Sequence, residues 1–92
     1  MTDEKQLDMF KYFVESYFNL SMDYEELESV IKEFLQAEST GRILELKREV
    51  KILYDMDSTD FVRNFVLKYG KRRLNDERVI GMLILLNTKL RL

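Results

Sequence analysis

The chain has 92 residues, of which 46% are hydrophobic, and its formal net charge is −2. A chain of this length is expected to form a single domain that spans residues 1–92. It contains no cysteine and no histidine, which excludes disulfides, thiolate metal sites and thiol nucleophiles, and removes the commonest general base and metal ligand.

Helical periodicity begins near the N-terminus. Apolar residues recur at spacings of three and four from about residue 4 to residue 18, and this pattern predicts an amphipathic helix. A second helix is expected over residues 24–38, because Asp23 is placed as its N-cap and Glu26 follows three residues later, as in a capping box. The residues that these two helices are expected to bury are Leu7, Phe10, Phe13, Val14, Tyr17, Phe18, Leu27, Val30, Ile31, Phe34 and Leu35.

Two more helices are expected in the middle of the chain. A third helix should start after the polar segment 39–41 and reach about residue 54. Ser58 is placed to cap a fourth, shorter helix that stops at Gly70. The residues expected inside from both are Ile43, Leu46, Val50, Leu53, Tyr54, Phe61, Val62, Phe65 and Tyr69.

The fifth helix, over residues 76–90, is apolar on every side. Its apolar residues are Val79, Ile80, Met82, Leu83, Ile84, Leu85 and Leu86. Such a helix is either central to a core or partly covered by a partner. In an all-α, compact bundle of about five short helices, we expect the C-terminal helix to be central, with the seam of a homodimer as the alternative. A strand would also suit a short apolar run, but no second strand is available to pair with it.

The sequence shows no signal for export or membrane insertion. Residues 1–6 are charged, so we expect no secretory signal. The longest uncharged apolar stretch, residues 79–87, is much shorter than the roughly 20 residues of a membrane-spanning helix. We therefore expect a cytoplasmic protein that does not enter the membrane.

Catalysis would have to rely on carboxylates, lysine, serine, threonine or tyrosine. Most carboxylates fall on outward helix faces, and Asp55 and Asp57 at a helix end are typical of capping. No glycine-rich phosphate loop is present, and helical di-metal centres normally need Glu-x-x-His pairs. We therefore expect a protein that is not an enzyme, with no catalytic residue, no metal-binding residue and no cofactor.

Charge is distributed unevenly, which suggests a charged partner. Residues 1–38 carry ten acidic and three basic residues, whereas residues 39–92 carry seven acidic and twelve basic residues. A helical wheel places acids on the outer faces of the first two helices, with a tyrosine among them. An aromatic anchor within a charged rim is typical of protein interfaces, although a solvated face has the same pattern. The predicted partner-binding residues are Asp8, Tyr12, Glu15, Glu25 and Glu28.

A basic cluster supports an alternative function. Its members are Lys68, Lys71, Arg72, Arg73 and Arg78, and Tyr69 lies among them. Positive charge beside an aromatic residue suits phosphate binding, so a small helical nucleic-acid-binding or regulatory module is the alternative. The apolar fifth helix is unsuited to be a recognition helix, and the acidic first half would repel a duplex. A nucleic-acid partner is therefore the less favoured expectation.

The N-terminal half resembles a known family. Residues 9–18, MFKYFVESYF, and residues 24–35, YEELESVIKEFL, look like the opening of the small immunity proteins of bacterial contact-dependent growth inhibition systems. The layout is similar as well, with a chain of comparable length, helices throughout, a leucine-rich third helix and a short helix that ends in Tyr69-Gly70. Residues 19–23 depart from the family, in which a His-Gln-Asp-Trp-like run is common.

The resemblance implies a role without catalysis. Proteins of this family bind and neutralise a cognate toxin domain in the cytoplasm. Many such toxins are nucleases, whose substrate sites are positively charged because they hold phosphates. The resemblance therefore implies a protein–protein interface in which an acidic helical surface covers such a site or docks beside it.

Overall fold

The structure, a computed structural model, describes residues 7–18, 24–56 and 58–90. Within these ranges the chain is helical and contains no strand, which confirms the all-α bundle of about five helices. None of the described helices is long and apolar enough to cross a membrane. The elements in chain order are α1 (Asp8–Ser16), the 3-10 helix η2 (Tyr24–Glu26), α2 (Leu27–Ala37), α3 (Thr40–Met56), α4 (Thr59–Gly70) and α5 (Asp76–Lys89).

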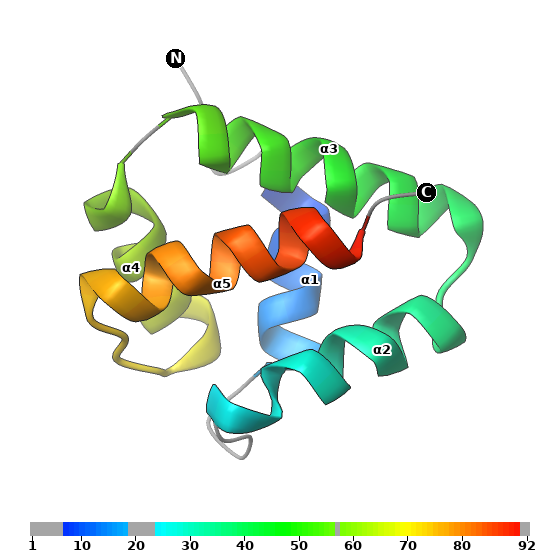
Figure 1. Cartoon of the computed structure of the whole chain (residues 1–92), viewed down its shortest axis with the longest axis horizontal. Coiled ribbons are helices and arrows are strands. Elements are labelled where there is room, and N and C mark those ends of the chain that lie inside the picture. The colour runs from blue at the N-terminus through cyan, green and yellow to red at the C-terminus, as the bar shows by residue number, and fades with distance from the viewer. Residues whose placement is uncertain (1–6, 19–23, 57, 91–92) are drawn as a thin grey trace.

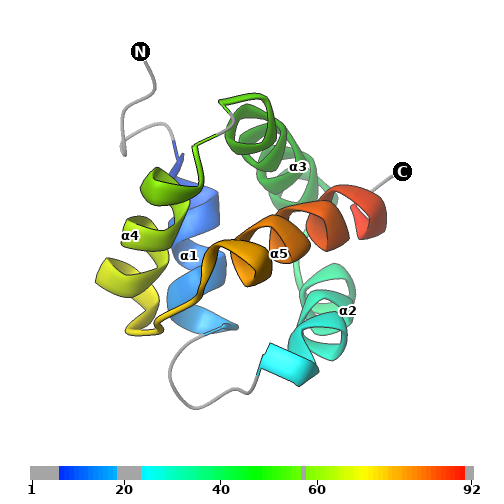
Figure 2. The same cartoon turned by 60° about the vertical axis from the view of Figure 1, so that its left-hand side comes forward.

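The C-terminal helix lies across one face of the bundle. In Figure 1, α5 crosses the front, with α3 above it, α2 below it and α4 at its N-terminal end, and contacts join it to all three. Helix α1 runs behind α5 and packs against α3 and α4, as the turned view in Figure 2 shows. The core is therefore enclosed between α1 and α5, with the other helices around it.

Aromatic rings make up much of that core. The rings of Phe10 and Phe65 are 5.3 Å apart and join α1 to α4, and the rings of Phe13 and Phe34 are 5.6 Å apart and join α1 to α2. Such tilted and edge-on pairs add to the free energy gained from burial. The largest fully buried side chains are Phe10, Phe13, Phe18, Phe34, Phe65, Leu7, Leu27, Ile31, Leu46, Leu53, Met82 and Leu86.

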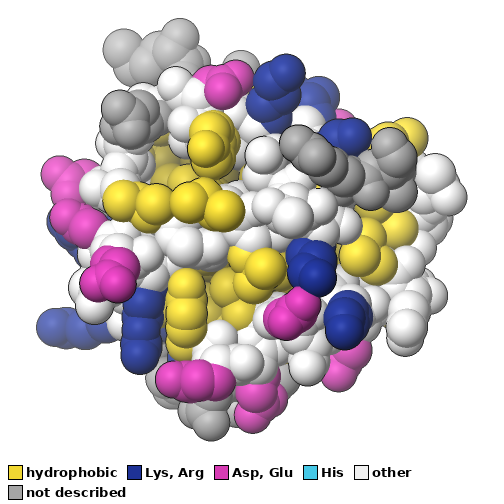
Figure 3. All heavy atoms as spheres, viewed as in Figure 1, with side chains coloured by type: hydrophobic (Ala, Val, Ile, Leu, Met, Phe, Trp, Pro, Cys, Tyr) yellow, Lys and Arg dark blue, Asp and Glu magenta, His cyan; other side chains and the backbone are white. Residues whose placement is uncertain are grey.

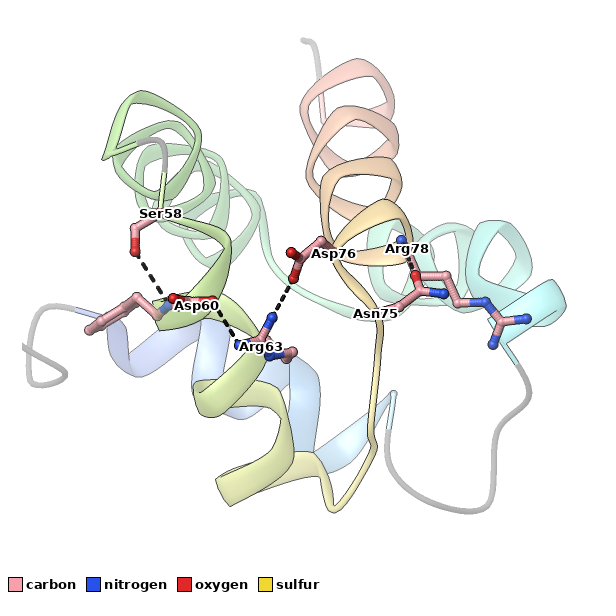
Figure 4. A network of polar contacts seen from close by, with 7 residues as sticks. Ser58, Asp60, Arg63, Asn75, Asp76 and Arg78 are labelled. Carbon is pink, nitrogen blue, oxygen red and sulfur yellow. Dashed lines mark hydrogen bonds and ion pairs between the residues drawn. The ribbon is translucent and has the colours of Figure 1, made fainter.

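Side-chain caps fix the start of the last two helices. Ser58 accepts a hydrogen bond from the amide of Phe61, as its sequence position predicts. Asn75 accepts one from the amide of Arg78 at 2.8 Å and begins α5 (Figure 4). The predicted cap of the second helix, Asp23, lies outside the described residues.

An arginine joins these two helix starts to each other. Arg63 of α4 forms ion pairs with Asp60, one turn earlier, and with Asp76 in the first turn of α5 (Figure 4). Both carboxylates lie near helix N-termini, where negative charge is favourable. The network links the first turns of α4 and α5. Because its three groups are partly exposed, it adds little to the stability of the bundle.

Helix α4 ends at Gly70, as predicted, but the glycine is there for a different reason. Gly70 is the last helical residue, and the left-handed residue after it is Lys71, with φ 59°. Gly70 is buried, and a Cβ there would lie 2.5 Å from Cγ1 of Val14. Glycine is therefore needed because α1 passes close to this backbone, and the positive φ that usually requires glycine falls on a lysine.

The fifth helix contacts α2, α3 and α4, as expected of a central helix, but it lies at one face and is not covered on every side. Its residues Val79, Met82, Leu83 and Leu86 are buried, whereas Ile80 and Ile84 are each 47% exposed. Tyr54 of α3, which was expected inside, is also exposed. Neighbouring helices contact only part of the surface of a helix, so its outward side stays open even when every side chain on it is apolar.

A buried carboxylate was not expected. Glu49 of α3 is 1% exposed, and its Oε1 accepts a hydrogen bond from the backbone amide of Phe10 at 2.7 Å. Phe10 lies in the first turn of α1, whose N-cap position is occupied by Leu7, a residue without a capping side chain. Glu49 therefore caps α1 from another helix and satisfies an amide that α1 itself leaves free.

The surroundings of this carboxylate favour its neutral form. Burial raises the pKa of Glu49 to about 8, and a hydrogen bond to Glu45 adds to the shift, while the amides of Phe10 and Met9 oppose it. The pKa of Glu45 is lowered, first by its hydrogen bond with Arg48 and then by the one with Glu49. At neutral pH, Glu49 thus keeps its proton and Glu45 carries the charge.

Candidate protein-binding surface

A groove of about 810 Å³ lies between η2–α2 and α5. It lies where the N-terminal ends of α2 and α5 approach each other. Its lining residues are Tyr24, Glu25, Leu27, Glu28, Asn75, Glu77, Arg78, Gly81 and Leu85.

Tyr24 lines the groove and packs against the backbone of α5. Its hydroxyl donates a hydrogen bond to the carbonyl oxygen of Arg78 at 3.2 Å, and the guanidinium of Arg78 lies 4.9 Å from the centre of its ring. A Cβ on Gly81 would lie only 2.8 Å from the Tyr24 hydroxyl. The absence of a side chain at Gly81 therefore lets the tyrosine lie against the backbone of α5 and keeps this part of the groove open.

Acidic side chains dominate the rim of the groove. Glu25 approaches Arg78 at 3.9 Å, and Glu28 forms an ion pair of 2.7 Å with Lys89 at the other end of α5. The hydrogen bond from Lys89 lowers the pKa of Glu28. Glu77 is also exposed on the rim, so carboxylates outnumber basic groups among the lining residues.

Apolar surface adjoins the groove. Gly81 and Leu85 face into it from α5, and the exposed Ile80 and Ile84 lie on the next face of the same helix. Figure 3 shows hydrophobic side chains in yellow among charged ones on this side of the molecule, where α5 crosses in Figure 1. An acidic rim beside exposed isoleucines would be complementary to an amphipathic, basic partner.

The structure brings together only part of the predicted partner-binding set. Glu25 and Glu28 lie on the rim of the groove. Asp8 and Glu15 are exposed on α1, which runs on the far side of α5 in Figure 1. The acidic residues of α1 and those of α2 therefore do not form one continuous outer face. The two helices contact each other through aromatic rings, those of Phe13 and Tyr17 on one side and Phe34 on the other.

Tyr12 does not stand outward among acids, which corrects the helical-wheel placement. Its ring packs against the core, 6.4 Å from the ring of Phe34, and its hydroxyl donates to Oε2 of Glu38 at 2.8 Å. Tyr17 donates to the same oxygen, and Arg42 forms an ion pair with Glu38 at 2.9 Å. These three partners, led by Tyr17, lower the pKa of Glu38, and they give Tyr12 a structural role between α1 and the end of α2.

The predicted basic cluster is also divided. Arg78 belongs to the groove, where it faces Glu25 and Tyr24. Lys71, Arg72 and Arg73 remain together on the connector between α4 and α5. The guanidinium of Arg72 lies 4.6 Å from the centre of the Phe18 ring, which makes it partly a packing residue.

Neither the described side chains nor the comparisons assign a chemistry to these surfaces. Among the described residues, no group of three or more acidic side chains is arranged to hold a metal ion. No protein-family model, no curated protein and no solved structure matches the chain. The resemblance of the N-terminal half to immunity proteins therefore stays a prediction.

Proposed function

We propose that this chain is an immunity-type protein that binds and neutralises a cognate toxin domain, and that it does so through the groove between α2 and α5. Its partner is a basic protein surface, as expected for a nuclease or another toxin that acts on phosphates. The chain acts by occupying that surface, without a cofactor.

The observation that carries this proposal is the composition of the groove. Glu25, Glu28 and Glu77 supply negative charge around it, and Tyr24 and Leu85 supply apolar contact inside it. The charges would speed and orient the encounter with a basic partner, while buried apolar contacts would slow its release. The exposed Ile80 would extend the apolar contact beyond the groove.

The resemblance supports the biological side of the proposal. The segments that resemble immunity proteins include Tyr24 and the first turns of α2, so the residues that carry the resemblance also form one wall of the groove. A homodimer through the exposed face of α5 would compete for the same isoleucines, and the oligomeric state should therefore be measured alongside binding.

Protection of cells tests the proposal. The toxin domain encoded beside this gene is expressed together with the chain, and growth is compared for the native chain and for Glu25→Lys/Glu28→Lys. We expect the double variant to protect poorly, with a toxin association rate reduced by about tenfold or more at low salt. Glu33→Lys is the matched control, because Glu33 is exposed on α2 and does not line the groove.

A second pair of variants tests the apolar contacts of the proposed toxin interface. Ile84→Asp should speed dissociation of the toxin, whereas Leu44→Asp on α3, with a similar exposed fraction of 48%, should not. If the groove and α5 variants protect cells as well as the native chain does, the toxin interface lies elsewhere. If no toxin domain is encoded beside the gene and the chain protects against none, the immunity role is wrong.

A further inference from the structure

A second surface, distinct from the groove, lies at the C-terminal end of α4 and on the connector that follows it. Two adjoining hollows of about 340 and 310 Å³ share Leu67 and Arg73. Their lining residues are Arg63, Asn64, Leu67, Lys71, Arg72, Arg73 and Leu74. Every ionisable residue in this set is basic, and none of these residues lines the groove between α2 and α5.

The apolar centre of this surface is Leu67. Its side chain is 39% exposed, and it faces both hollows from the last turns of α4. Arg73 stands beside it, is exposed, and forms no ion pair within the described ranges. Arg63, at the other edge of this surface, is paired with two aspartates, so the positive charge around Leu67 comes mainly from the connector.

Lys71, which follows α4, places a positive charge beside Leu67. Lys71 has the left-handed conformation that glycine adopts most easily, and its Nζ donates to the carbonyl oxygen of Lys68 at 3.1 Å. A side chain in this conformation costs stability relative to glycine. The lysine keeps its ammonium over the C-terminal end of α4, where positive charge is also favoured by the helix dipole.

We propose that this surface binds an acidic protein segment that places one apolar side chain on Leu67 and its carboxylates against Lys71 and Arg73. The size of the surface favours a short segment over a nucleic acid. Arg78, which would have extended the positive charge, is held in the groove by Glu25, and Asp60 and Asp76 lie on the other side at Arg63. A duplex would meet these acids, whereas a short peptide would need to cover only Leu67 and the connector.

Fluorescence anisotropy with two labelled peptides tests this inference. One peptide consists of aspartate and glutamate with leucines at its centre, and the other has serines in place of the leucines. We expect the leucine peptide to bind more tightly, and Leu67→Ser and Arg73→Gln each to weaken it by roughly three- to tenfold. Lys51→Gln is the matched control, because Lys51 is exposed on α3 and lines neither hollow.

Lys71→Gly separates charge from folding. Glycine suits the left-handed conformation at this position, so the variant should be at least as stable as the native chain and yet bind the leucine peptide more weakly. Amide chemical shifts on titration should change around Leu67 and Arg73 and not around Tyr24 in the groove, which separates this surface from the proposed toxin site.

Three outcomes would overturn the inference. Equal affinity for the leucine and serine peptides would mean unspecific attraction of charge, and no binding of either would mean that the surface takes no acidic segment. Tighter binding of a duplex DNA of equal charge, lost in Arg73→Gln, would assign the surface to nucleic acid instead.

Discussion

The buried carboxylate of Glu49 makes the stability of the bundle depend on pH in a range where few proteins without histidine respond. Its pKa in the folded chain is raised to about 8 from an ordinary value of 4.5. Between these two values the folded chain binds more protons than the unfolded chain, so the free energy of unfolding falls as pH rises. The stabilising effect of the proton is complete below pH 4.5 and is lost by about pH 8.

The size of this effect follows from the shift. One pKa unit corresponds to about 1.4 kcal/mol, so the loss between the two pH values is on the order of 3–5 kcal/mol. That is a large part of the stability of a small domain. No histidine is present to titrate in the same range, and the lowered pKa of Glu45 acts only below 4.5, where it removes stability as pH falls.

Glu49→Gln isolates the responsible group. A glutamine oxygen can still accept the amide hydrogen of Phe10, and its NH2 group can donate to Glu45 as the protonated acid does. We expect the variant to match the native chain near pH 5 and to be more stable than it near pH 8, with a nearly flat profile between. Urea denaturation followed by circular dichroism at several pH values measures both profiles.

Parallel profiles would refute this reasoning. If the native chain and Glu49→Gln lose stability equally between about pH 5 and pH 8, the carboxylate is not protonated in the folded chain. Glu49→Leu is the control for the hydrogen bond itself. Relative to Glu49→Gln, it should be less stable at every pH by about 1–3 kcal/mol, because the amide of Phe10 then has no acceptor.

Two other stability predictions follow from packing, and thermal denaturation checks both. Gly70→Ala should destabilise the bundle by about 1–3 kcal/mol because its methyl group would meet Val14, whereas Gly41→Ala, in open space on α3, should add up to about 1 kcal/mol. Equal effects at the two glycines would contradict the close approach of α1 and α4. Leu83→Ala should cost about 2–5 kcal/mol and Ile84→Ala less than about 1 kcal/mol; the reverse order would mean that α5 has another register.

Local patterns in the sequence were sufficient for the helices themselves. The apolar spacing of α1 and α2 predicts their buried faces, including Phe10, Phe13 and Phe34, because residues three and four apart share a face whatever the helix packs against. Ser58 could be identified as a cap because the hydrogen bond it accepts comes from three residues away. The number and order of the helices are therefore properties of the sequence alone.

Only the tertiary structure decided which of the polar residues share a surface. Periodicity places Tyr12 on the outer side of α1. In the structure its hydroxyl donates a hydrogen bond to Glu38, twenty-six residues away, and its ring is partly buried against the core. Glu25 and Glu28 meet Arg78 and Lys89 across a helix pair that no spacing in the sequence reveals.

The burial of Glu49 was likewise decided by the tertiary structure. Glu49 belongs to the polar pattern of α3, and nothing near it in sequence marks it as buried. It is inside because the N-terminus of α1, thirty-nine residues earlier, lacks a capping side chain and lies against α3. The sequence by itself determines what each helix can bury, whereas the contacts between helices decide which polar groups are satisfied and which apolar ones stay exposed.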